Sequence, residues 1–157
     1  MKIQLMAVGR TSTPYIQQGL KTYLDRLSHY IPLETTIIPD IKNTRSITEQ
    51  RQKELEGQAM MQRIATGDFV VLLDEKGRRY TSRQFAAFIE KKMLSLPQRL
   101  TFIVGGPYGF SQEIYNRANH MLSLSDMTFP HELVRLFFAE QLYRAFTIIG
   151  GEPYHHD

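Results

Sequence analysis

Five short apolar runs alternate with segments of helical periodicity along the whole chain, and this alternation is what most constrains the fold. The runs are rich in Val, Ile, Leu and Phe, as strands buried on both faces are. They cover about residues 2–8, 33–38, 68–74, 99–104 and 121–125. Such an alternation predicts a mostly parallel sheet of five to six strands with helices on both faces. We therefore expect an α/β fold in a single domain that spans residues 1–157.

Capping residues mark the starts of the first two predicted helices. Thr13 followed by Pro14 predicts the start of the first helix, because Pro is well tolerated at the first helical position. Residues 46–49, Ser-Ile-Thr-Glu, have the form of a capping box. They predict a second helix that stops near Gly67.

The next two helices carry similar signals. Thr81 with Gln84 predicts the start of a third helix, which must end before Pro97. Ser111 predicts the start of a short fourth helix after the glycine-rich segment. These signals place a helix after each of the first four strands.

The last predicted helix, residues 130–149, carries apolar side chains in almost every direction around its axis. They are Leu133, Leu136, Phe137, Phe138, Leu142, Tyr143, Phe146 and Ile149. Such a helix must be covered on two sides, by its own sheet and by a second partner. In a chain this short a second copy of the protein is the simplest cover, so we expect a homodimer. The alternative is a central helix that is buried within one protomer.

Composition and charge restrict the function classes. The chain has no Cys, which excludes a disulfide framework, a thiolate nucleophile and a thiolate zinc site, and we expect no bound metal. The first nine residues do not resemble a signal peptide, and no apolar run is long enough to span a bilayer. We therefore expect a cytoplasmic protein without a membrane partner. A formal net charge of +3 permits a polyanionic partner but does not by itself indicate one.

Three glycines follow the fourth predicted strand, at positions 105, 106 and 109. Paired glycines after an apolar strand allow a ligand to approach the backbone closely, as in a cofactor cleft at the carboxyl edge of a parallel sheet. Their G-G-x-x-G spacing is not the dinucleotide-binding fingerprint, and the chain has no P-loop sequence. A tight turn without a ligand is an equally good explanation of the glycines.

Basic residues surround one tyrosine between the third strand and the third helix. They are Lys76, Arg78, Arg79 and Arg83, next to Tyr80. This combination could contact phosphates and stack on bases. A solvated loop followed by the first turn of a helix explains it at least as well, so both interpretations stay open.

Residues 131–135, His-Glu-Leu-Val-Arg, begin like the helix of a zinc protease. Position 135 is Arg where the second His ligand would be, so we reject zinc hydrolysis. His131 follows Pro130 at a helix start, where an imidazole can shape the neighbouring loop. An ordinary hydrogen-bonding role for His131 is the alternative.

Two further candidates for chemistry lie near the C-terminus. Arg144 follows Glu140 by one helical turn, which fits a simple ion pair or a guanidinium placed to grip a phosphate or a base edge. The tail after the last helix carries Tyr154 and His155, which could stack on a base and move a proton. A frayed terminus without function is the alternative.

Five segments together resemble a known family. They are Met1–Gly9, Ile103–Gly109, Leu122–His131, Glu140–Phe146 and Pro153–His155. Through them the chain closely resembles the bacterial large-subunit (23S) ribosomal RNA pseudouridine N3-methyltransferases of the SPOUT class. The resemblance spans the full length of the chain, and its motifs are specific.

The resemblance implies a SPOUT-type α/β fold with a C-terminal trefoil knot, which the general rarity of knots would not suggest. It also implies a homodimer, and it implies that the loops after the third, fourth and fifth strands bind S-adenosyl-L-methionine. The implied cofactor-binding residues are Leu73, Gly105, Gly106, Leu124, Ser125, Asp126, Met127, Thr128 and Phe129.

The implied reaction is a direct methyl transfer to N3 of a pseudouridine in 23S rRNA, with the assembled ribosome as substrate. Because N3 must lose its proton, a nearby base or a charge that favours the anion is expected. We expect Arg144 to stabilise the developing anion or to position the base. We expect Tyr154 and His155 to cover the nucleotide, with His155 as the candidate proton acceptor.

Three other functions remain open. The first is a SPOUT methyltransferase for transfer RNA or for another ribosomal base. The second is a noncatalytic ribosome-associated protein that keeps the knot and does not bind the methyl donor. The third is a flavodoxin-like nucleotide-binding module, which would be a monomer that binds FMN or ATP.

Overall fold

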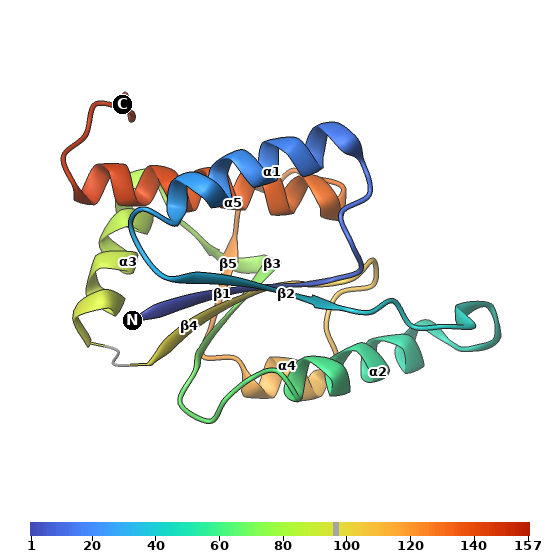
Figure 1. Ribbon diagram of the computed structural model, residues 1–157. Helices are drawn as coiled ribbons and strands as arrows, with labels where there is room; N and C mark the ends of the chain where they lie inside the picture. The colour runs from blue at the N-terminus through green and yellow to red at the C-terminus, as the bar shows by residue number, and fades with distance from the viewer. Residues whose placement is uncertain (96–97) are drawn as a thin grey trace.

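A five-stranded parallel sheet forms the centre of the molecule (Figure 1). The computed structural model describes residues 1–95 and 98–157. Its elements are β1 (Lys2–Val8), α1 (Pro14–Leu27), β2 (Leu33–Ile38), the 3₁₀ helix η1 (Thr44–Ser46), α2 (Glu49–Met61), β3 (Phe69–Arg79), α3 (Ser82–Ser95), β4 (Arg99–Val104), α4 (Gln112–Arg117), β5 (His120–Ser123) and α5 (His131–Ile149). The strand order is β2-β1-β4-β3-β5, and all neighbouring strands are parallel. The predicted parallel α/β sheet is confirmed.

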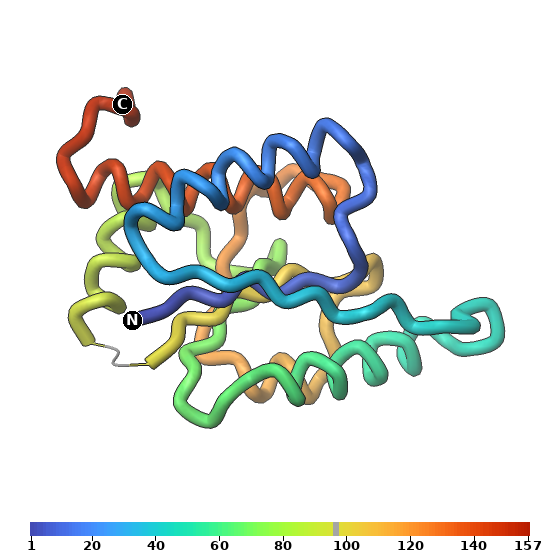
Figure 2. The backbone as a smooth tube through the Cα atoms, viewed as in Figure 1, coloured from blue at the N-terminus to red at the C-terminus, as the bar shows by residue number. Residues whose placement is uncertain are grey.

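Helices cover both faces of this sheet, as its apolar sequence requires. Helices α1, α3 and α5 lie on one face, and α2 and α4 lie on the other (Figures 1 and 2). Neighbouring residues of β4 belong to different cores: Phe102 packs with the α1, α3 and α5 side, and Ile103 packs with the α2 and α4 side. Both side chains are at most 1% exposed, which explains why the strands read as continuous apolar runs.

The predicted boundaries of the second helix are wrong at both ends. Thr48 is its N-cap, and the Thr48 hydroxyl accepts a hydrogen bond from the Arg51 amide at 3.0 Å. Ser46, the expected first residue of the capping box, instead ends the separate helix η1. The helix ends at Met61, well before Gly67, because local backbone hydrogen bonds close the intervening residues into turns.

The other predicted helix starts are confirmed. Helix α1 begins at Pro14, and α4 begins after Ser111, whose hydroxyl accepts from the Ile114 amide at 3.4 Å. At the start of α3, Thr81 and Gln84 form a reciprocal capping box with bonds of 3.0 and 3.1 Å. The expected stop of this helix at Pro97 falls outside the described residues.

Strand β3 is longer than predicted and bends around β5. Leu122 of β5 pairs with both Leu73 and Arg78 of β3, with a register shift between these two residues. Gly77 lies in this shift, directly against the β5 backbone: a Cβ atom at Gly77 would lie 2.5 Å from the Leu122 nitrogen. Only glycine allows so close an approach of two chain segments. The predicted end of β3 near residue 74 is therefore wrong, and Lys76 and Arg79 belong to a strand instead of a solvated loop.

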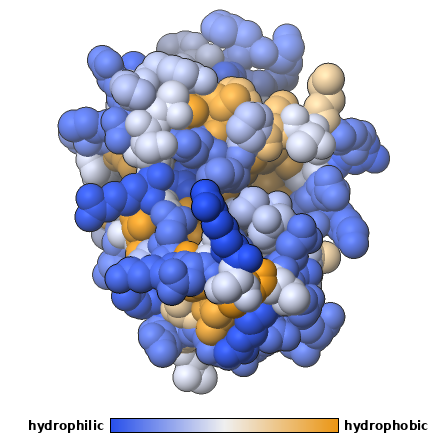
Figure 3. Space-filling view, turned by 90° about the vertical axis from the view of Figure 1, so that its right-hand side faces the viewer, coloured by the Kyte–Doolittle hydropathy of each residue, from blue (hydrophilic) through white to orange (hydrophobic). Residues whose placement is uncertain are grey.

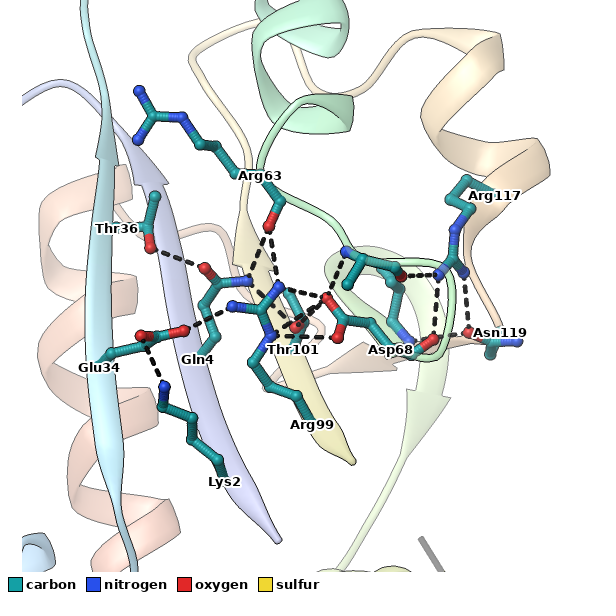
Figure 4. Close-up of polar contacts among 12 residues, drawn as sticks. Lys2, Gln4, Glu34, Thr36, Arg63, Asp68, Arg99, Thr101, Arg117 and Asn119 are labelled. Atoms are coloured by element: carbon teal, nitrogen blue, oxygen red, sulfur yellow. Dashed lines mark hydrogen bonds and ion pairs between the residues drawn. The ribbon is translucent and has the colours of Figure 1, made fainter. Parts of the chain in front are cut away.

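The amino edge of the sheet carries a polar network among residues of β1, β2 and β4 and of the segments before β3 and β5 (Figure 4). Arg99 of β4 contacts Asp68 at 2.6 Å and Glu34 of β2 at 2.5 Å. The Gln4 side chain of β1 accepts a hydrogen bond from the Thr36 hydroxyl at 2.7 Å. The network lies at the edge opposite the glycine-rich loops, so it contributes to the fold and not to the site described below.

Helix α5 packs against both α1 and α3 on the same face of the sheet (Figure 2). Its side chains Phe138, Leu142 and Phe146 are at most 3% exposed, so much of its apolar surface is covered within one chain. Phe137 stays 39% exposed and packs edge-on against Phe129, with ring centroids 5.0 Å apart. The homodimer expected from this helix remains a prediction.

Candidate functional site

A cleft of about 700 Å³ opens at the carboxyl edge of the sheet, among residues 73–76 of β3 and the loops that follow β4 and β5. Its size falls within the range of small-molecule sites. The parallel strands bring these segments together, because their carboxyl ends meet at one edge. The expected loop after the third strand is therefore part of β3 itself. Figure 3 shows the molecule from the side toward which β1 and β2 point, where hydrophobic residues are visible between hydrophilic ones.

The glycine loop after β4 forms one wall of this cleft. Gly106 and Gly109 form an isolated bridge, with the Gly109 amide donating to the Gly106 carbonyl at 3.2 Å. Gly109 has a φ of +84°, which favours glycine, and a Cβ at Gly105 would lie 3.1 Å from the Phe110 ring. The loop is thus a tight turn and a cleft wall at once, so the two interpretations of its glycines do not exclude each other.

The loop after β5 also lines the cleft. The Ser125 hydroxyl accepts a hydrogen bond from the Met127 amide at 3.0 Å, and the Ser123 hydroxyl donates to the Ser125 carbonyl at 3.1 Å. All of the expected cofactor residues except Asp126 line the cleft. Those that line it are Leu73, Gly105, Gly106, Leu124, Ser125, Met127, Thr128 and Phe129. Asp126 instead pairs with Arg79, and its side chain is 72% exposed.

The cleft also contains polar residues that sequence reasoning missed. Asp74 follows the apolar part of β3 and accepts a hydrogen bond from the Tyr115 hydroxyl at 2.5 Å. Burial and this carboxylate raise the pKa of Tyr115 to about 12. Lys53 of α2, Glu75 and Lys76 add charges of both signs to the lining. Lys53 lies far from the glycines in sequence, and Tyr115 follows Gly109 by six residues; no local pattern marks either of them.

The expected catalytic residues form a separate cluster around Glu140. Arg144 contacts the Glu140 carboxylate at 2.6 Å and the His155 Nδ1 atom at 3.0 Å. The Tyr154 hydroxyl donates to the same carboxylate at 2.9 Å, and the Arg144 guanidinium lies 4.8 Å from the centre of the Tyr154 ring. The hydrogen bond to Glu140 raises the pKa of Arg144, and burial raises the pKa of Tyr154. The structure therefore brings Arg144, Tyr154 and His155 together, and the ion pair with Glu140 is present as well.

The two clusters lie at different places along α5. Val134 near its start lines the cleft, whereas Arg144 comes ten residues later. At 1.5 Å per residue this is about 15 Å along the helix axis. Among the described residues, the cleft lining includes neither Arg144 nor the tail. The structure of one chain therefore does not bring the expected catalytic residues to the expected cofactor residues.

The start of α5 supports the rejection of a zinc-protease helix. His131 lines the cleft, which agrees with a role in shaping the loop. Arg135 is only 5% exposed and donates hydrogen bonds to the carbonyls of Val8 and Gly9 at 2.6 and 2.8 Å. It thus ties α5 to the end of β1. Within residues 1–95 and 98–157, no group of three or more His, Cys, Asp or Glu side chains could hold a metal ion.

Within the described residues, no helix is both long enough and apolar enough to cross a membrane.

Comparisons with known proteins agree with this geometry. The family model "Predicted SPOUT methyltransferase" matches residues 1–155. The chain is 51% identical over 157 residues to a protein of Parabacteroides distasonis named ribosomal RNA large subunit methyltransferase H, and the match covers all of both chains. A protein of the same name from Christiangramia forsetii is 51% identical over 156 residues, which is 99% of each chain.

A solved structure supports the fold at low sequence identity. It is described as a probable methylase family protein from Haemophilus influenzae Rd KW20, and it matches with a TM-score of 0.57 and 11% identity. The match covers 99% of this chain and 70% of that one. The resemblance expected from the sequence is thus confirmed, and the chain belongs to the SPOUT methyltransferase family.

Proposed function

We propose that the protein transfers a methyl group from S-adenosyl-L-methionine to N3 of a pseudouridine in 23S ribosomal RNA, on the assembled ribosome. The observation that carries this proposal is the cleft between residues 73–76 of β3 and the loops after β4 and β5, in a chain of the SPOUT methyltransferase family. The full-length relatives named ribosomal RNA large subunit methyltransferase H support the choice of substrate.

The cleft fits the proposed methyl donor in its chemistry. Leu73 and Leu124 offer apolar walls for the adenine and ribose, and the glycine loop offers backbone groups for hydrogen bonds. The rim carries charges of both signs, for example Asp74 and Lys53, which suits the ammonium and carboxylate of an amino acid. When bound, S-adenosyl-L-methionine supplies an electrophilic methyl group on a positively charged sulfur. Among the proposed binding residues, Asp126 has the least structural support, because its side chain pairs with Arg79.

The cluster around Glu140 is proposed to act on the nucleotide. The N3 imide must lose its proton before it attacks, and the charge of Arg144 favours the resulting anion. The His155 Nδ1 atom accepts a hydrogen bond from Arg144 at 3.0 Å, and its Nε2 atom lies 2.6 Å from the Asp157 carboxylate. His155 is the proposed proton acceptor, and it must release one of these two contacts to take the proton. The Tyr154 ring lies beside the same guanidinium and is proposed to cover the base.

A homodimer would join the two clusters. Because Arg144 lies about 15 Å along α5 from the cleft of its own chain, we propose that the partner subunit supplies the catalytic cluster to each cleft. The exposed Phe137 beside Phe129 is an apolar surface that such a dimer would cover. The C-terminal trefoil knot is proposed with the family, and the passage of β3 around β5 at Gly77 is compatible with it.

Methyl transfer from labelled S-adenosyl-L-methionine tests the proposal directly. The acceptors are ribosomes and, in a separate reaction, transfer RNA from cells that lack this protein, and the modified nucleotide is mapped by mass spectrometry. We expect label on a pseudouridine of the large subunit. Label on transfer RNA alone would support the other SPOUT activity, and absence of cofactor binding would contradict the methyltransferase assignment.

Mixed dimers test the shared site. Arg144→Ala removes the proposed charge from the tail cluster, and Leu124→Asp disrupts the proposed cofactor wall. Each variant alone should lose roughly 100-fold or more in activity. Dimers with one copy of each variant keep one intact combination of cleft and tail, so mixing should restore activity. If Arg144→Ala and His155→Ala both keep wild-type turnover, the catalytic assignment is wrong.

A further inference from the structure

A buried carboxyl group lies directly behind the glycine loop of the cleft. Glu56 of α2 is only 2% exposed. A Cβ atom at Gly106 would lie 2.8 Å from the Glu56 Oε1 atom and 2.9 Å from its Oε2 atom. Gly106 itself lines the cleft. A residue of the cleft wall is thus in contact with a carboxyl group that solvent does not reach.

This carboxyl group is incompletely paired. Its Oε2 atom accepts a hydrogen bond from the Gln52 side chain at 3.2 Å. Its Oε1 atom is buried and has no hydrogen-bond partner in residues 1–95 and 98–157. Buried polar atoms of folded proteins are nearly always satisfied, so an exception of this kind needs an explanation. An unpaired oxygen next to a ligand cleft leaves this carboxyl group uncompensated, so that its ionisation can respond to the charge of a ligand in the cleft.

The charges around Glu56 leave it without a cation in the free protein. Asp40, after β2, faces it as a second negative charge. Lys53 lies one turn earlier on α2, but it belongs to the cleft lining. Among the described residues, the groups that act on Glu56 are Gln52 and Asp40, and neither is a cation. Burial, with a smaller effect of Asp40, raises the pKa of Glu56. The free protein therefore holds a proton on this carboxyl group more readily than an ordinary Glu does.

We propose that Glu56 selects for a positively charged ligand in the cleft, by losing its proton to solvent and pairing electrostatically, across Gly106, with the charge of the bound molecule. This inference rests on the proposed function, in which the methyl donor carries a positive sulfonium and the demethylated product carries a neutral sulfur. Glu56 then favours the donor over S-adenosylhomocysteine and helps the product to leave. It acts through the loop, so it is a specificity residue and does not touch the reacting atoms.

The sign of the effect follows from the charges. A cation near Glu56 stabilises its ionised form, so donor binding releases a proton in the pH range between the pKa of the complex and that of the free protein. The affinity for the donor should fall as the pH falls through this range, while the affinity for the neutral product stays level. Two charges in a partly buried site interact strongly enough for a preference of about tenfold.

Titration calorimetry tests this without any turnover. S-adenosyl-L-methionine and S-adenosylhomocysteine are titrated into the whole protein at several pH values from 4.5 to 7.5. Each pH is measured in two buffers that both hold it but differ in ionisation heat, such as phosphate and Bis-Tris near pH 6.5, because the difference in heat reports proton release. The variants are Glu56→Gln, which keeps the shape of the side chain, and Glu54→Gln. Glu54 is a matched control, since it lies on the same helix but is exposed and pairs with Arg51.

We expect the wild type and Glu54→Gln to release protons on binding the donor but not the product. Glu56→Gln should release none, and its affinity for the donor alone should drop about tenfold. Equal proton release with both compounds in the wild type would overturn the inference, and this comparison needs no variant. Equal losses of affinity for both compounds in Glu56→Gln would instead mean that Glu56 only braces the loop. If the wild type binds neither compound, the cofactor assignment itself fails, and the inference fails with it.

Discussion

The two edges of the sheet differ in how completely their buried polar groups are paired. At the amino edge, Arg99 joins Asp68 and Glu34, and each of these carboxylates has further partners (Figure 4). At the carboxyl edge, glycines open a cleft, and the Glu56 Oε1 atom has no partner among the described residues. The carboxylates at the amino edge thus have partners within the chain, whereas the carboxyl edge has an open cleft next to a carboxyl oxygen without one in the described part of the chain.

This difference separates stability from function. Removing one member of a buried ion pair lowers the free energy of unfolding strongly, because the remaining charge is left buried and unpaired. An open cleft with incompletely paired groups lowers the stability of the free protein but gains binding energy when a ligand supplies the partner. We therefore expect changes at the amino edge to affect mainly the free energy of unfolding, and changes at the carboxyl edge to affect mainly ligand binding.

Asp68→Ala should have the largest effect. The Asp68 side chain is 2% exposed and also accepts a hydrogen bond from the Ala65 amide at 2.9 Å. Its removal leaves the guanidinium of Arg99 partly unpaired and should lower the free energy of unfolding by about 3–5 kcal/mol. Urea unfolding measures this loss, while donor affinity at a temperature where the variant is folded should stay near the wild-type value.

The control for this change is Asp25→Ala. Asp25 pairs with Lys21 on the surface of α1, and both side chains are more than half exposed. We expect a change of at most about 0.5 kcal/mol there. Similar losses for Asp25→Ala and Asp68→Ala would contradict the special role of the amino edge.

Gly77→Ala should affect both the free energy of unfolding and the affinity for the methyl donor. The new Cβ would lie 2.5 Å from the Leu122 nitrogen, and the backbone cannot move aside as a flexible side chain can. We expect a loss of about 1–3 kcal/mol in unfolding free energy. Because Leu73 and Leu122, on either side of this crossing, line the cleft, calorimetry should also show weaker donor binding.

Gly150→Ala is the matched control for this glycine. Its Cβ would meet the flexible Glu152 side chain at 3.3 Å, at the end of α5. It should change the unfolding free energy by less than about 0.5 kcal/mol and leave donor affinity unchanged. Wild-type stability of Gly77→Ala would mean that the close passage of β3 and β5 is not a constraint.

Much of the fold could be predicted from local sequence. The bounds of β1, β2 and β4 agree with the predicted runs 2–8, 33–38 and 99–104, because these segments are rich in Val, Ile, Leu, Phe and Thr, which favour strands. The extension of β3 to Arg79 could not be predicted in this way. Its polar residues carry no strand periodicity, and pairing with β5, distant in sequence, holds them in place.

The part of the candidate site that is formed by the backbone could be predicted from the sequence. Gly105 and Gly106 mark a loop without side-chain obstruction, and the structure places both in the cleft wall. Glu56 and Tyr115 come from α2 and α4, and only the packing of these helices brings them to the cleft. Asp126 has the right position in the chain, but its side chain pairs with Arg79. Side-chain direction on an exposed loop is not encoded in a local pattern.

The smallest expected effect is a difference in pH dependence between the two edges. Arg99 and Lys2 lower the pKa of Glu34, so this carboxylate contributes stability above its unfolded-state pKa and loses it as the pH falls through the folded-state value. Burial raises the pKa of Glu56, so its contribution is present below the unfolded-state pKa and is lost as the pH rises through the folded-state value.

Urea unfolding of Glu34→Gln and Glu56→Gln between pH 4 and 8 measures both contributions against the wild type. The stability lost in Glu34→Gln should be about 0.5–1 kcal/mol near neutral pH and should shrink toward acid, since Glu34 is partly exposed and screened. The wild type should instead lose stability relative to Glu56→Gln as the pH rises. Parallel pH profiles for the two variants would contradict the contrast, because they would mean that both carboxylates have the same kind of surroundings. Opposite slopes would show that the amino edge holds a paired carboxylate, whereas the cleft edge holds one that still lacks its partner.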